Sequence, residues 1–97
     1  MFPADRVALR GERAEFQLAS ETGNVVTREF CPRCGSPILG RNTGMPGFVT
    51  LSLGAFEDSS DFAPEVAIFT RSLRRWDSIG EAIPRFETQP GWRPDRP

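Results

Sequence analysis

Short stretches of alternating apolar and polar residues, separated by turns, run through the first half of the chain. Val7 and Leu9 begin this alternation, and residues 12–20 repeat it. Because the side chains of a strand point alternately to its two faces, each stretch predicts a half-buried strand. We expect these first two strands to pair as a hairpin.

Three further strands are predicted before residue 54. Residues 25–30 are rich in β-formers and end at Cys31, and a second run begins with Ile38. The clearest alternation occupies residues 48–53, which follow a segment rich in turn-forming residues at 42–47. The expected order is therefore strand, cysteine segment, strand, turn, strand.

The second half of the chain has a different pattern. Residues 66–69 are continuously apolar, which predicts a strand buried on both faces. After Arg71 the alternation is lost, so we expect an irregular tail packed over the sheet. The pattern predicts a mainly β fold in one domain over residues 1–88, followed by a loosely ordered tail at 89–97 that holds three prolines.

Composition agrees with this fold and excludes several functions. Nine glycines and nine prolines among 97 residues favour short strands joined by turns. The net charge of −1 gives no field that would attract nucleic acid. No apolar run is long enough to span a membrane and the N-terminus lacks signal-peptide features, so we expect a cytoplasmic protein without nucleic-acid or membrane partners. The chain has no histidine, tyrosine or lysine, which excludes histidine-based, phenol and Schiff-base catalysis.

The candidate site is the segment Cys-Pro-Arg-Cys-Gly at residues 31–35, which holds both cysteines of the chain. Two cysteines at this spacing serve either as thiolate ligands of a metal or as a dithiol redox pair. A redox motif normally continues into a helix, whereas Gly35 and the following Ser-Pro break one, so the flanks favour a metal knuckle. Two sulfurs cannot complete a four-sulfur zinc site, so Cys31 and Cys34 predict a half site. Reduced thiols without metal and a redox pair remain the alternatives.

These pieces, in this order, resemble the glutathione-dependent formaldehyde-activating enzyme family, whose relatives include centromere protein V. The cysteine motif alone is common among zinc ribbons, and the ordered set is more specific. The residues that carry the resemblance are Glu15 and Phe16, residues 28–38, residues 49–58, residues 67–69 with Ser72 and Trp76, and residues 80–86.

The resemblance implies a fold like that of Mss4, with small sheets around zinc knuckles. It also implies a structural zinc held by four cysteines, two of which match Cys31 and Cys34. A separate catalytic zinc on three further cysteines would serve a carbon-sulfur lyase of the S-(hydroxymethyl)glutathione synthase type. The glutathione adduct of formaldehyde is the substrate that the family implies.

The chain departs from this pattern because no cysteine precedes Cys31. The family's other structural pair and its catalytic cluster lie upstream of the position where Met1 stands, and Ala67 stands where relatives often have histidine. We therefore expect a truncated family member, the C-terminal two thirds of the domain, which is inactive alone. A homodimer or a partner would supply the missing zinc ligands. The alternatives are a non-catalytic interaction module completed by a partner or second copy, and a small redox protein that cycles Cys31 and Cys34.

Overall fold

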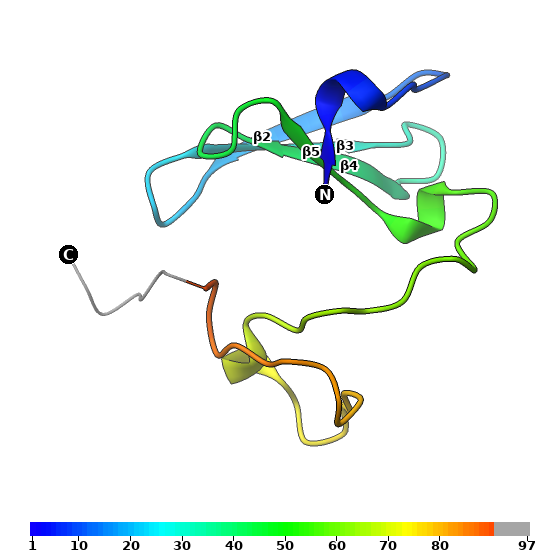
Figure 1. Ribbon diagram of the computed structural model, residues 1–97. Coiled ribbons are helices and arrows are strands. Elements are labelled where there is room, and N and C mark those ends of the chain that lie inside the picture. Colours follow the sequence, from blue (N-terminus) through cyan, green and yellow to red (C-terminus); the bar gives the residue numbers. More distant parts are fainter. Residues whose placement is uncertain (91–97) are drawn as a thin grey trace. The chain divides into compact units, whose positions relative to one another are not determined.

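The computed structural model describes residues 1–90. They divide into two compact units, Met1–Ser59 and a second unit that begins at Ser60. The first unit holds a β-sheet, and the described part of the second consists of turns, extended segments and one short 3₁₀ helix (Figure 1). Most of the predicted tail at 89–97 lies outside the described residues, and the single domain over residues 1–88 stays a prediction.

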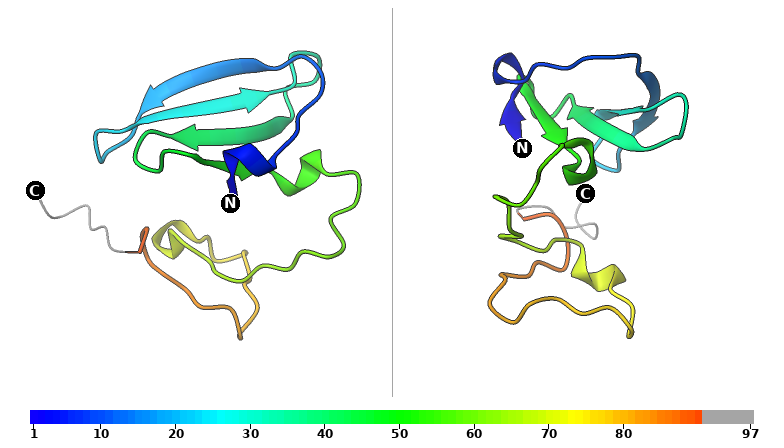
Figure 2. Two further views of the ribbon diagram at one scale, coloured as in Figure 1. Left: turned by 45° about the horizontal axis from the view of Figure 1, so that its top comes forward. Right: turned by 90° about the vertical axis from the view of Figure 1, so that its right-hand side faces the viewer.

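The sheet has five strands, and every neighbouring pair in it is antiparallel. Its order is β1-β5-β4-β3-β2, so β2 to β5 follow one another in the sheet as they do in the chain (Figure 2). The mainly β prediction is confirmed. The strands are β1 (Phe2–Pro3), β2 (Ala14–Ala19), β3 (Val25–Phe30), β4 (Pro37–Asn42) and β5 (Phe48–Leu51).

The predicted strand at Val7 and Leu9, and its hairpin with residues 12–20, are wrong. The 3₁₀ helix η1 (Ala4–Arg6) follows β1, and residues 7–13 contain no strand. β2 pairs instead with β3, from Ala14 opposite Phe30 to Ala19 opposite Val25. The connection between β2 and β3 is a tight turn closed by a 2.8 Å hydrogen bond from the Ser20 N–H to the Asn24 carbonyl. A short loop costs little entropy to close, which favours this pairing.

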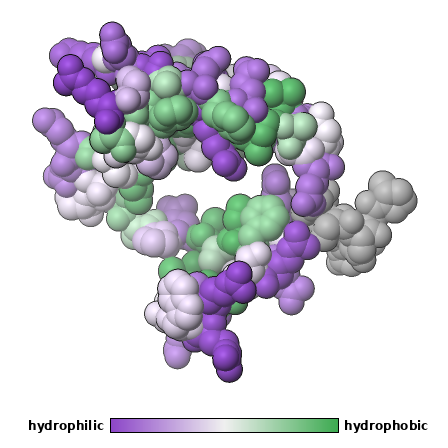
Figure 3. Space-filling model, turned by 180° about the vertical axis from the view of Figure 1, so that it is seen from behind, coloured by the Kyte–Doolittle hydropathy of each residue, from purple (hydrophilic) through white to green (hydrophobic). Residues whose placement is uncertain are grey.

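The core of the sheet unit is small and lies on one face. The register places Glu29 opposite Leu39 and Leu39 opposite Leu51, so these side chains share a face. Leu39 and Val49 are the buried apolar residues of the described chain. In the space-filling view, apolar side chains gather along one side of the sheet unit (Figure 3). A core of this size leaves much of the stability to hydrogen bonds and ion pairs around the sheet.

β5 ends two residues earlier than the alternation predicts. Val49 is buried and Thr50 is exposed, as expected for a strand with one covered face. Leu53, however, begins the 3₁₀ helix η2 (Leu53–Ala55) and is 47% exposed. The Ser52 N–H still donates to the Ile38 carbonyl of β4 at 2.9 Å, and the Phe56 N–H donates to the Leu53 carbonyl within η2 at 3.1 Å.

The described part of the second unit is irregular, as predicted for the segment after Arg71, whereas the packing of that segment over the sheet stays a prediction. Ala67 forms a single parallel bridge with Arg85, and Val66 and Ile68 are about half exposed. The predicted buried strand at residues 66–69 is therefore wrong. Phe69 adopts a left-handed conformation, with φ 57°, and leads into the 3₁₀ helix η3 (Thr70–Ser72), which ends the extended run. The described residues contain no helix long and apolar enough to cross a membrane.

Candidate functional site

The cysteine segment forms a closed turn between β3 and β4. The Gly35 N–H donates to the Cys31 carbonyl at 2.8 Å, and the Cys31 N–H donates to the Ser36 carbonyl at 2.9 Å. Gly35 has φ 79°, so this position needs a residue without a Cβ, as the knuckle interpretation predicts. The turn therefore holds both cysteine side chains at the same end of the sheet.

The two cysteines are free thiols with different exposure. Cys31 is half-buried and Cys34 is exposed. The Cys34 thiol donates to the Ser36 hydroxyl at 3.2 Å. Hydrogen bonds from the Ser36 side chain and backbone, and then from the Cys31 side chain, lower the pKa of Cys34 from its ordinary value. Because the thiolate is the form that binds metal and attacks disulfides, the turn prepares Cys34 for either chemistry.

An ion-pair cluster holds the end of the strand that leads into the turn. The Glu29 carboxylate, 9% exposed, lies 2.8 Å from Nε of Arg13 and 3.3 Å from Nη2 of Arg41. Arg41 also reaches the Glu15 carboxylate at 3.3 Å. The β3–β4 register shifts between Glu29 and Phe30, so the bulge and the cluster lie just before Cys31. This arrangement fixes the direction in which the chain enters the knuckle.

The donor set matches half of a tetrahedral zinc site. Within residues 1–90, no group of three or more cysteine, histidine or carboxylate side chains could hold a metal together. The sequence contains two cysteines and no histidine, so a single chain offers two of the four sulfur ligands of a structural zinc. The assignment of Cys31 and Cys34 as metal ligands stays a prediction.

The structure also contains a cavity that sequence reasoning missed. Residues 6–10, which have no strand, line it together with residues from β4, β5 and η2. The apolar positions Val7 and Leu9 both belong to its wall. Val7 is half-buried and Leu9 is 40% exposed, so their alternation marks residues that line the cavity and does not mark a paired strand.

Comparison with known proteins identifies the family. A family model described as glutathione-dependent formaldehyde-activating enzyme matches residues 1–72, which include the whole sheet and the cysteine turn. Comparisons with curated proteins and with solved structures gave no match. Since the matched region covers most of the 97 residues and agrees with the motifs at 28–38 and 49–58, the chain belongs to the glutathione-dependent formaldehyde-activating enzyme family.

Proposed function

We propose that the chain is a zinc-knuckle module of its family. In this proposal Cys31 and Cys34 supply two thiolates to a structural zinc, and a second copy of the chain or a partner protein supplies the other two. The observation that carries it is the closed turn around Gly35, which places two thiols together with no third ligand beside them in residues 1–90. Zinc binding by small modules contributes about 10 kcal/mol or more, so a half site gains from recruiting its other half.

We further propose that the chain alone does not catalyse the carbon-sulfur lyase reaction of its family. Activation of a thiol or carbonyl by zinc requires a metal held with an open position. The ligands available for such a centre are few, because the sequence has no cysteine besides Cys31 and Cys34 and no histidine. Turnover of the glutathione adduct would then depend on cysteines from outside this chain.

A second candidate function is dithiol exchange, supported by the exposed Cys34 thiol with its lowered pKa beside Cys31. The Cys34 thiolate would attack a substrate disulfide and release one thiol. The Cys31 thiol would then displace the second, leaving a Cys31–Cys34 disulfide and a reduced substrate. Both candidate functions use reduced cysteines and suit the cytoplasm, where thiols are kept reduced.

Native mass spectrometry of the zinc-loaded chain tests the first proposal, with EDTA as the control. We expect one zinc per two chains, with loss of the dimer when EDTA removes the metal. Cys31→Ser should abolish both zinc binding and dimerisation, whereas Thr50→Ser, an exposed change in β5, should leave both unchanged. If the purified chain alone gives a zinc-free monomer but zinc appears with a cysteine-bearing protein, the partner form of the proposal is supported.

Two results would contradict these proposals. A zinc-free monomer that binds no zinc with any added thiol protein, and that reduces insulin disulfides in a Cys34-dependent way, would replace the zinc module with the redox function. The lyase proposal is tested by following adduct formation from formaldehyde and glutathione. We expect the uncatalysed rate, and a rate that rises in proportion to the chain concentration would refute inactivity.

A further inference from the structure

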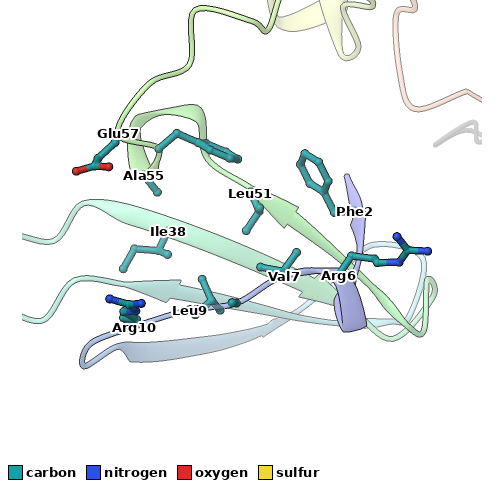
Figure 4. A pocket seen from close by; sticks show the side chains of 11 residues that line it. Phe2, Arg6, Val7, Leu9, Arg10, Ile38, Leu51, Ala55 and Glu57 are labelled. Atoms are coloured by element: carbon teal, nitrogen blue, oxygen red, sulfur yellow. The ribbon is translucent and has the colours of Figure 1, made fainter.

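A cavity of about 780 Å³ lies within the sheet unit (Figure 4). This volume is in the range of about 300–1,000 Å³ that is common for small-molecule sites. The rings of Phe2 and Phe56 lie 6.4 Å apart, tilted by 47°, on one side of it. The apolar part of its wall is formed by Phe2, Val7, Leu9, Ile38, Leu51 and Phe56.

The charged residues of the wall are distributed unevenly. Arg6, Arg10 and Glu57 line the cavity. Arg6 lies at the end near Phe2, while Arg10 and Glu57 lie toward the opposite end (Figure 4). Among the ion pairs of residues 1–90, none involves Arg6 or Arg10. The Arg6 side chain is exposed and extends outward from the Phe2 end (Figure 4), so this end carries a positive charge without a carboxylate in the wall beside it.

We propose that this cavity binds an amphiphilic anion, namely a monocarboxylate with an apolar body. The carboxylate would pair with the planar guanidinium of Arg6, which matches its two oxygens. The apolar body would lie on the aromatic and aliphatic wall toward Leu9 and Ile38. Charge complementarity supports an anion, because the lining residues include two arginines and one glutamate. The apolar wall supports a ligand with few polar groups beyond its head.

This site goes beyond the proposed zinc function. Neither Cys31 nor Cys34 lines the cavity, so loss of metal binding and loss of ligand binding are separate results. The Cys31→Ser variant should bind the ligand as the unchanged chain does.

Isothermal titration with decanoate, below its micelle concentration, tests the proposal on the full chain. We expect saturable binding of one decanoate per chain, with decanol and decyltrimethylammonium at least tenfold weaker. Arg6→Gln should weaken decanoate binding at least tenfold. Arg28→Gln removes an exposed arginine of β3 that is not in the wall, and it should leave the affinity unchanged. Leu9→Gln, in a segment without secondary structure, should weaken binding without unfolding the sheet.

Circular dichroism of each variant checks that the fold is retained. Binding that does not saturate, that is as tight for decyltrimethylammonium, or that survives both Arg6→Gln and Leu9→Gln would overturn the proposal. Reduced glutathione is anionic but lacks an apolar body, so it should not displace decanoate. Displacement at comparable concentrations would also overturn it.

Discussion

The ion pair between Arg13 and Glu29 allows a quantitative test of how the sheet supports the cysteine turn. Arg13→Met keeps most of the side-chain volume but removes the charge that lies 2.8 Å from Glu29. At an effective dielectric of about 20, two unit charges at that distance attract by about 6 kcal/mol before desolvation is counted. Desolvation of a carboxylate that is 9% exposed cancels much of this attraction. The partly exposed Arg41 remains 3.3 Å away, so we expect a net loss of about 1–3 kcal/mol.

Urea denaturation, followed by the circular dichroism of the β-sheet, measures this loss. With a slope of about 1–3 kcal/mol per molar urea, a change of 2 kcal/mol moves the midpoint by about 1 M. The matched control is Arg28→Met, which changes an exposed arginine of the same sheet and should stay within about 0.5 kcal/mol. The double variant Arg13→Met with Glu29→Leu replaces the pair by apolar groups and should recover most of the loss.

Equal stability of the Arg13→Met and Arg28→Met variants would refute a stabilising role of the Arg13–Glu29 ion pair. This role is also refuted if the double variant loses the full sum of the two single changes, because additivity would mean that the side chains do not interact. If the double variant regains most of the stability lost in Arg13→Met, the loss in the single variant comes from leaving the buried Glu29 carboxylate with only the weaker partner Arg41.

Two further predictions concern the cysteine turn. Gly35→Ala should destabilise the chain by about 1–2 kcal/mol and weaken zinc binding. The new Cβ would meet no atom within 4 Å, but a residue with a Cβ is strained at φ 79°. Equilibrium unfolding and zinc titration measure the two effects, and unchanged values would contradict the turn geometry. Ser36→Ala removes the hydrogen bond that does most to lower the pKa of Cys34. Alkylation of Cys34 by iodoacetamide is therefore compared in two variants, Cys31→Ser alone and Cys31→Ser with Ser36→Ala. The pH–rate profile of the double variant should lie at higher pH. The pKa of the Cys34 thiol is lower in the folded chain than in the unfolded chain. The thiolate therefore stabilises the fold at pH above the unfolded-state pKa, and this stabilisation is lost as the pH falls through the folded-state pKa. An unshifted pH–rate profile would show that Ser36 does not act on the thiol.

Local patterns predicted the parts of the fold that depend on adjacent residues. The strand before Cys31, the strand after the turn and the start of β5 at Phe48 agree with the structure, because each is a short β-rich run bounded by turn residues. Gly35, whose place after the second cysteine favours a knuckle over a helix, has the positive φ of a turn. The family, too, was recognisable from the ordered motifs, and the match over residues 1–72 confirms it.

Residues 66–69 show why apolar character alone does not make a strand. The run is as apolar as a buried strand, yet a strand needs a partner along its length, and here Ala67 alone finds one, in Arg85. The left-handed Phe69 then turns the chain into η3. A bridge partner that lies 18 residues away along the sequence, as Arg85 does from Ala67, leaves no trace in the local pattern.

The sequence by itself determined the β-rich character, the family, the paired cysteines and the shortage of other zinc ligands, because these depend on residue identity and near-neighbour spacing. Only the tertiary structure decided that β2 pairs with β3 rather than with residues 7–9, that β1 closes the far edge against β5, and that Val7 and Leu9 line a cavity with Arg6 at one end. An alternating pattern states which side chains share a face, but strand pairing and cavity walls arise from contacts between distant segments. Those contacts are set by loop closure and by the competition of all segments for the same sheet edges.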